Sequence, residues 1–276
     1  MDRMETARFR GDVLATGVQS CRLTSNAPRG VDLWDVTDPR NPRHLAFWPS
    51  GTVRSGSPRG VHELDIFQRG NRAYLAVTVP FSEFKDGQGD LRLVDITDPR
   101  KPRQVSDWGA IRDGGLVPRL GKAIFAHAVD VDETGTRAAV SYWDAGAILL
   151  DITDPAAPIF IGSTVYPRGS EGNTHSAEFV GKRRYMVTTD EDINPKGGWG
   201  FLRIWDVGRK GSPLEVARFA TRHSNQSQSP AGGIDHLITN DKFCMTRQGH
   251  LTLNWSRYEV WRAGQERRTT GSTTYP

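Results

Sequence analysis

The sequence is poor in cysteine and has no long apolar segment. Among its 276 residues there are two cysteines, Cys21 and Cys244, near opposite ends of the chain. They allow at most one disulfide, which a closed ring would bring within reach, but we expect two buried thiols. No apolar stretch reaches the length of a membrane span, and the charged N-terminal segment 1–17 has no apolar core of a signal peptide. From the sequence as given we therefore expect a cytoplasmic protein without a membrane span.

Familiar catalytic and nucleic-acid motifs are also missing. The sequence contains no GxSxG elbow, phosphate-binding loop, HExxH or CxxC. The net charge is +4 and the pI about 9.2, but the basic residues are spread out, apart from short groups at 182–184 and 267–268. A nucleic-acid reader would be expected to show a basic stripe and a recognisable motif, so we expect no nucleic-acid partner.

What the chain does contain is a repeat. The motif reads GVDLWDVTDPRNP at 30–42, GDLRLVDITDPRKP at 89–102 and GAILLDITDPAAP at 146–158, with a weaker copy, GFLRIWDVGRKGSP, at 200–213. The aligned aspartates are Asp35, Asp95, Asp151 and Asp206, at spacings of 60, 56 and 55 residues. A repeat of this length indicates one supersecondary unit that is used several times.

Each unit is expected to form a four-stranded antiparallel sheet. In the second unit, short runs rich in β-forming residues at 62–67, 72–79, 91–96 and 104–108 are separated by turn residues. No segment shows a long helical period. We therefore predict an all-β chain that forms a single domain over residues 1–276, a β-propeller of about five four-stranded blades or a fragment of a larger propeller. The repeats lie near 10–50, 60–108, 124–165 and 174–221, and a degenerate or aberrant last blade covers 222–276.

The repeated aspartates have a structural interpretation. Asp and Thr before proline bond the backbone locally, and proline fixes φ while offering no N–H for strand pairing. We therefore expect these aspartates to hold turns.

The GxxLxDxTDPxxP repeats resemble the LVIVD repeat family over roughly residues 10–221. The strand, the aspartate, the Asp-Pro turn and the second proline recur together, which makes the resemblance specific. It implies a propeller scaffold and little chemistry. Many members of that family are exported, whereas this chain shows no signal peptide, so the compartment stays open.

The two ends depart from the pattern. The first copy is expected to start at its second strand, 11–17, with no inner strand of its own. The last segment has no Asp-Pro turn, and its strands are expected at 233–238, 243–247, 250–255 and 258–261.

A histidine begins each expected inner strand. These residues are His62, His127, His175 and His236, whereas His44, His223 and His250 fall outside the pattern and are expected at the surface. If the inner strands line a central channel, the four side chains converge on its mouth. Convergent imidazoles are good ligands for Cu, Zn or Fe. The pattern resembles copper-dependent propeller oxidases of the selenium-binding-protein type, whose channel histidines bind the metal.

Acidic residues near these histidines could add ligands or a general base. They are Glu63, Glu83, Asp86, Asp144, Asp190, Glu191, Asp192 and Asp235. The alternative is structural, since a histidine recurring in a repeat can bond the backbone of a neighbouring blade.

Three functions stay open at this stage. The first is a binding scaffold that takes a protein or small-molecule ligand at the channel mouth. The second is a metal-dependent oxidase or hydrolase, and the third is a structural surface-repeat protein. The tryptophans at 48, 108, 143, 199 and 205 are expected to be blade-packing or rim residues.

Overall fold

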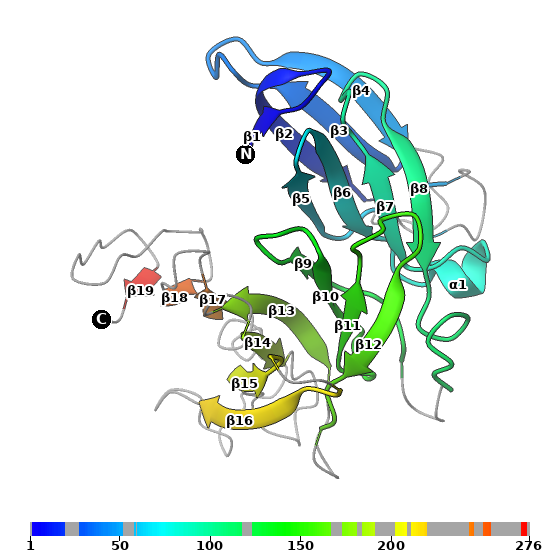
Figure 1. Ribbon diagram of the computed structural model, residues 1–276, viewed down its shortest axis with the longest axis vertical. Coiled ribbons are helices and arrows are strands. Elements are labelled where there is room, and N and C mark those ends of the chain that lie inside the picture. Colours follow the sequence, from blue (N-terminus) through cyan, green and yellow to red (C-terminus); the bar gives the residue numbers. More distant parts are fainter. Residues whose placement is uncertain are drawn as a thin grey trace, which may run out of the picture.

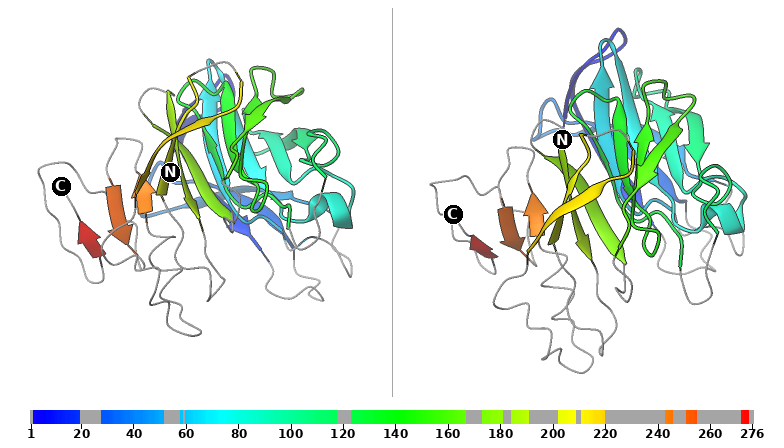
Figure 2. Two further views of the ribbon diagram at one scale, coloured as in Figure 1. Left: turned by 90° about the horizontal axis from the view of Figure 1, so that it is seen from below. Right: turned by 60° about the horizontal axis from the view of Figure 1, so that its bottom comes forward.

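The computed structural model describes residues 2–19, 28–51, 58, 60–117, 123–166, 173–180, 184–190, 202–208 and 211–219, together with three strands near the C-terminus. These residues form four four-stranded antiparallel sheets and one three-stranded sheet. Figures 1 and 2 show the four larger sheets following one another in chain order. The prediction of an all-β fold built from four-stranded antiparallel blades is confirmed.

Within each four-stranded sheet, the strands lie side by side in chain order. The first two sheets comprise β1 (Asp2–Glu5), β2 (Arg10–Val18), β3 (Gly30–Asp35) and β4 (Arg43–Pro49), then β5 (Leu64–Arg69), β6 (Arg72–Thr78), β7 (Leu91–Asp95) and β8 (Arg103–Trp108). The next two comprise β9 (Val129–Val131), β10 (Arg137–Ser141), β11 (Ala147–Asp151) and β12 (Ile159–Ser163), then β13 (Thr174–Val180), β14 (Tyr185–Asp190), β15 (Leu202–Asp206) and β16 (Leu214–Phe219). The three-stranded sheet contains β17 (Phe243–Met245), β18 (Leu251–Asn254) and β19 (Ser272–Thr274).

The described part of the chain has a single short helix, α1 (Ser82–Lys85), between β6 and β7. No described helix is both long and apolar enough to cross a membrane.

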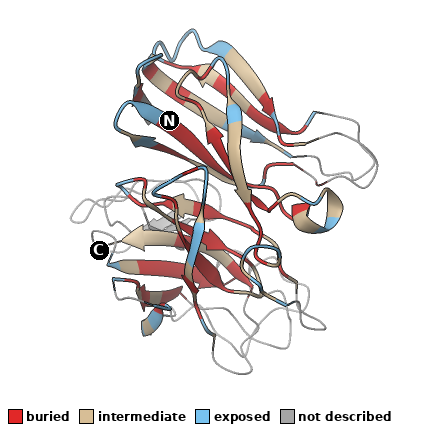
Figure 3. Ribbon diagram, turned by 45° about the vertical axis from the view of Figure 1, so that its right-hand side comes forward, coloured by how far each residue is buried: buried red, intermediate tan, exposed pale blue. Residues whose placement is uncertain are grey.

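The sheets pack face to face, so the middle strands bury both of their faces. In β7, Leu91 and Leu93 pack with residues of β11, whereas Val94 packs toward β3 on the other side. Figure 3 shows buried residues running through the middle strands of the larger sheets. Trp48, Trp108 and Trp205 are buried, as expected for blade packing.

The inner strands contact one another across the sheets, in the order β5, β9, β13. An equivalent hydrogen bond joins β5 to β9 and β9 to β13. Asp65 of β5 accepts the backbone N–H of Val131 at 2.9 Å, and Asp130 of β9 accepts that of Phe179 at 2.8 Å. Each aspartate lies three residues after an inner-strand histidine, so the two junctions share one register.

The repeated aspartates hold turns, as predicted. Oδ1 of each accepts the backbone N–H of the residue two positions later, at 2.7–3.0 Å: Thr37 to Asp35, Thr97 to Asp95, Thr153 to Asp151 and Gly208 to Asp206. The hydroxyl and backbone N–H of Thr37 lower the pKa of Asp35, and those of Thr153 lower the pKa of Asp151. These carboxylates are therefore structural.

One expectation about the ends needs correction. The first sheet does have an inner strand of its own, because β1 pairs with β2 along residues 2–5. This strand was missed because it has neither the histidine nor the apolar run of the others. In the last segment, strands occur at 243–245 and 251–254 as expected, and a third occurs at 272–274. The strands expected at 233–238 and 258–261, and the side chains of Cys21 and Cys244, lie outside the described residues. The single-domain boundary stays a prediction.

The turn role of Asp95 gives a first test. Asp95→Ala leaves the Thr97 N–H without its acceptor and should lower the free energy of unfolding by about 1–2 kcal/mol. Asp95→Asn keeps an acceptor oxygen and loses only the ion pair with Arg72, whose side chain is 55% exposed, so its cost should be about 0.5 kcal/mol or less. Urea unfolding measures both, and equal losses in the two variants would contradict the turn assignment.

Candidate functional site

The starts of three inner strands bring three histidines together. His62 precedes β5, His127 precedes β9 and His175 is the second residue of β13. Nε2 of His62 lies 2.9 Å from Nε2 of His127, and the ring centroids of His127 and His175 are 4.2 Å apart. The structure thus groups three of the four histidines that the repeat singled out. The fourth, His236, lies outside the described residues.

Neighbouring groups fix the tautomer of His127. Its Nδ1 lies 3.1 Å from the backbone carbonyl oxygen of His175. A carbonyl only accepts hydrogen bonds, so Nδ1 carries the proton, and Nε2 of the neutral ring holds the lone pair. His62 therefore donates from its own Nε2. His127 bonds the backbone of the next sheet, as the structural interpretation expected, while its second nitrogen faces another imidazole.

Burial keeps this imidazole pair neutral. The loss of solvation at His127, which is 7% exposed, together with the nearby His175 and His62, lowers the pKa of His127 to about 2. Burial also lowers the pKa of His62, although much of its surface remains exposed. A base with so low a pKa is ineffective near neutral pH. A neutral imidazole can still accept a hydrogen bond or ligate a metal ion.

Three aromatic side chains extend the histidine group. The ring of Trp143 lies 5.4 Å from that of His127 and is stacked 5.0 Å from that of Phe125, which in turn lies 4.4 Å from that of Phe81. Phe81 follows β6, Trp143 follows β10 and Phe125 lies in the segment that leads into β9. We call this set the ring cluster: His62, His127, His175, Phe81, Phe125 and Trp143. Trp143 was expected as a packing or rim residue, and the structure places it beside His127.

Strained backbone conformations occur in and near the ring cluster. The described non-glycine residues with positive φ are Phe81 at 65°, Trp143 at 44° and Asn173 at 51°, two residues before His175. Bulky side chains rarely adopt this left-handed conformation, which costs about 1–3 kcal/mol per residue. The carbonyl of Trp143 accepts the N–H groups of Gly146 and Thr174, at 3.1 and 3.0 Å. The surrounding hydrogen bonds therefore hold the strained positions in place.

A buried carboxylate, Asp90, ties the loops of the site together. Its Oδ2 accepts the N–H groups of Phe81 and Ala126, at 3.2 and 3.0 Å, and its Oδ1 accepts that of Glu83 at 3.1 Å. Asp90 is 1% exposed, and this burial raises its pKa to about 6 in spite of the three hydrogen bonds. Because Ala126 directly precedes His127, Asp90 fixes the position of Phe81 relative to the imidazole pair.

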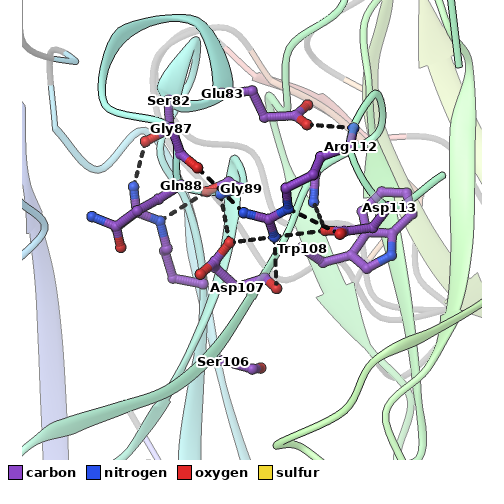
Figure 4. Close-up of polar contacts among 12 residues, drawn as sticks. Ser82, Glu83, Gly87, Gln88, Gly89, Ser106, Asp107, Trp108, Arg112 and Asp113 are labelled. Carbon is purple, nitrogen blue, oxygen red and sulfur yellow. Dashed lines mark hydrogen bonds and ion pairs between the residues drawn. The ribbon is translucent and has the colours of Figure 1, made fainter. Parts of the chain in front are cut away.

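A second polar network holds α1 against the loop after β8 (Figure 4). The guanidinium of Arg112 donates to Asp107 and Asp113, each at 2.6 Å. The carboxylate of Glu83 accepts the backbone N–H of Arg112 at 2.9 Å. The same carboxylate lies so close to Gly109 that a Cβ atom at position 109 would overlap it. Since Glu83 lies two residues after Phe81, this network supports the aromatic end of the ring cluster.

Four of the acidic residues considered as extra ligands form hydrogen bonds or ion pairs elsewhere. Besides Glu83, Asp86 accepts the hydroxyl of Ser82 at 2.7 Å, and Asp144 accepts the N–H of Ala123 at 2.6 Å. Asp190 is buried in β14 and pairs with Arg203 at 3.0 Å. Glu63 lies next to His62 in sequence and is partly buried; residues 191, 192 and 235 lie outside the described part. Among the described side chains, no group of three or more His, Cys, Asp and Glu is arranged to hold a metal ion, and metal ligation by the histidines stays a prediction.

No family model and no curated protein sequence matches the chain. Solved structures do match it. A hypothetical selenium-binding protein from Sulfolobus tokodaii is 13% identical with a TM-score of 0.51, over 74% of this chain and 51% of that one. The periplasmic gluconolactonase of Pseudomonas aeruginosa is 17% identical with a TM-score of 0.49, over 70% and 49% of the two chains. The β-propeller domain of Cps50 (Swd1) from Myceliophteria thermophila is 12% identical with a TM-score of 0.43, over 70% and 53%.

The four-stranded antiparallel sheets and the match to the selenium-binding protein show a β-propeller-like fold. The chain spans about half the length of these structures, since it covers 51%, 49% and 53% of them. At such low identity the likeness concerns the fold alone.

Asp90 is the main residue of the site that sequence reasoning missed. A signal was present, because Asp90 stands five residues before the repeated Asp95, where glycine stands before Asp35 and Asp151. Phe81 and Phe125 left no comparable signal, since they lie in loops outside the repeated motif.

The raised pKa of Asp90 leads to a second test. The pKa of Asp90 in the folded state, about 6, lies above the ordinary aspartate value of 3.8, so the folded state binds the proton at a higher pH than the unfolded state does. The resulting stabilisation is complete below about pH 4 and is lost as the pH rises through about 6. Between pH 7 and pH 4.5, the free energy of unfolding of the wild type should therefore rise by about 2 kcal/mol relative to that of Asp90→Asn.

Urea unfolding of both proteins at several pH values measures this difference, and carbon NMR of the Asp90 carboxyl group locates its pKa directly. A carboxyl that titrates near pH 4, with a stability difference independent of pH, would contradict the prediction.

Proposed function

We propose that the protein is a ligand-binding β-propeller that takes a small-molecule ligand over the ring cluster, where its inner strands begin. The observation that carries this proposal is the imidazole pair, in which the exposed His62 is hydrogen-bonded at 2.9 Å to the buried His127 of the next sheet. A polar pair at the junction of two sheets, with one member open to solvent, gives a ligand a directional hydrogen-bonding group.

Two further features support a binding role. Strained backbone positions that the surrounding structure maintains are typical of binding and catalytic sites. The resemblance of the repeats to the LVIVD family is also part of the proposal, because it implies a propeller scaffold without a fixed chemistry.

A transition-metal ion, Cu, Zn or Fe, is the second candidate ligand. The Nε2 atoms of His62 and His127, which lie 2.9 Å apart, would hold such an ion once the proton between them is released. Metal-binding histidines commonly donate their other N–H to a backbone carbonyl, as Nδ1 of His127 does to His175. A metal-dependent oxidase or hydrolase would require this ion, since His127 itself is too weak a base.

The binding proposal is tested with a fragment library and ligand-observed NMR in the presence of EDTA. Fragments that bind the wild type should bind His62→Ala at least tenfold more weakly, because they lose a hydrogen bond worth about 1.4 kcal/mol. His44→Ala is the matched control, since His44 lies in β4, is 46% exposed and is paired with Asp32. A library without a single fragment that distinguishes His62→Ala from the wild type would contradict the proposal.

The metal candidate has its own test. Calorimetric titration of EDTA-treated protein with Zn²⁺ and Cu²⁺ should show one site, and the affinity should fall about tenfold or more in His62→Ala and in His175→Ala while His44→Ala is unaffected. Elemental analysis of the purified wild type should show the same metal in near-stoichiometric amount. Titrations without saturable binding, or with equal affinity in all four proteins, would remove the metal candidate and leave the binding proposal standing.

A further inference from the structure

Three residues of the ring cluster form an aromatic ladder: Phe81, Phe125 and Trp143. Their ring centroids are 4.4 and 5.0 Å apart, and the planes of Phe125 and Trp143 are inclined by only 25°. Phe81, at one end, is 37% exposed, whereas Trp143, at the other, lies beside His127. The ladder therefore leads from a solvent-exposed ring to the imidazole pair.

Two carboxylates next to the ladder, those of Asp90 and Asp144, face backbone N–H groups. Asp90 receives the N–H groups of Phe81, Glu83 and Ala126, and Asp144 receives that of Ala123. The ladder itself consists of aromatic rings. A sugar would lack the set of polar partners that its hydroxyl groups require on such a surface.

The backbone indicates that the aromatic rings are there for more than packing. Phe81 and Trp143, at two successive sheets, both occupy the left-handed region, where glycine or asparagine fits without strain. Packing alone would favour those residues at such positions. Bulky rings retained at strained and partly exposed positions point to a surface that contacts a ligand.

We propose that the aromatic ladder recognises an uncharged, planar aromatic or heteroaromatic ring, which stacks on the exposed ring of Phe81 in a ligand that extends along the ladder toward the His62–His127 pair. This inference rests on the proposed function, since it names the ligand class of the same site. Stacking of offset or tilted rings favours a flat π-system over a saturated ring of equal size.

The test compares matched probes by NMR titration in EDTA: indole and phenol as planar probes, and cyclohexanol, glucose and tetramethylammonium as non-planar ones. Indole and phenol should bind at least tenfold more tightly than the other three. Phe81→Asn should weaken their binding about tenfold, whereas Phe81→Tyr, which keeps the ring, should restore it. Phe84→Asn is the control, since Phe84 is 60% exposed in α1 and lies outside the ladder.

Thermal unfolding separates recognition from packing. Asparagine tolerates the left-handed region, so Phe81→Asn should melt at the wild-type temperature or above it. A ring needed only for packing would instead lower the melting temperature in Phe81→Asn and leave probe binding unchanged. That result, or planar probes that bind no better than cyclohexanol, would overturn the inference.

The experiments distinguish a wrong ligand class for the ladder from a wrong proposed function. A fragment that depends on His62 but ignores Phe81→Asn would overturn only the ladder. Fragments that ignore His62→Ala altogether would overturn the proposed function.

Discussion

The contact between the inner strands of neighbouring sheets is the interaction on which the site depends. Asp65 and Asp130 each accept a backbone N–H from the next inner strand, in the same register. This register fixes where each inner strand begins relative to its neighbour. Because His62 and His127 lie three residues before these aspartates, their side chains meet at the junction between the sheets. The imidazole pair is therefore a consequence of how consecutive sheets dock.

The surroundings of a carboxylate decide whether its pKa is lowered or raised in this fold. Asp35 and Asp151, at turns near the surface, have lowered pKa values because threonine hydroxyls and N–H groups stabilise the charge. Asp90 also accepts backbone N–H groups, but the loss of solvation outweighs them and raises its pKa. Burial likewise holds His127 neutral. The loss of solvation thus raises the pKa of Asp90 and lowers that of His127, whereas the turn carboxylates keep lowered pKa values.

The repeated sheets could be predicted from the sequence because the patterns that specify them are local. The Asp-Pro motif, the β-forming runs and the histidine at the start of each inner strand all recur, and they predicted the sheets, the turns and the grouping of His62, His127 and His175. The junction aspartates recur as well, in the HELD and HAVD segments, so they could have been found at the same spacing. By contrast, β1 lacks these signals, and the contacts of Phe81, Phe125 and Asp90 depend on loops brought together by tertiary packing. No local pattern in a sequence contains that information.

This division suggests where the function of the fold resides. A residue copied in every repeat meets the same demand in every sheet, as the turn aspartates do, and a demand common to all sheets is structural. The ring cluster combines one copied element, the inner-strand histidine, with elements found at single positions. Asp90 stands where the first and third repeats have glycine, and it accepts the N–H groups of Phe81 and of Ala126, the residue before His127. A buried carboxylate with a raised pKa and a phenylalanine in the left-handed region both act against stability, since one costs solvation and the other backbone strain. Both features lie at the junction where we propose that a ligand binds, and the binding energy of that ligand is what would offset their cost.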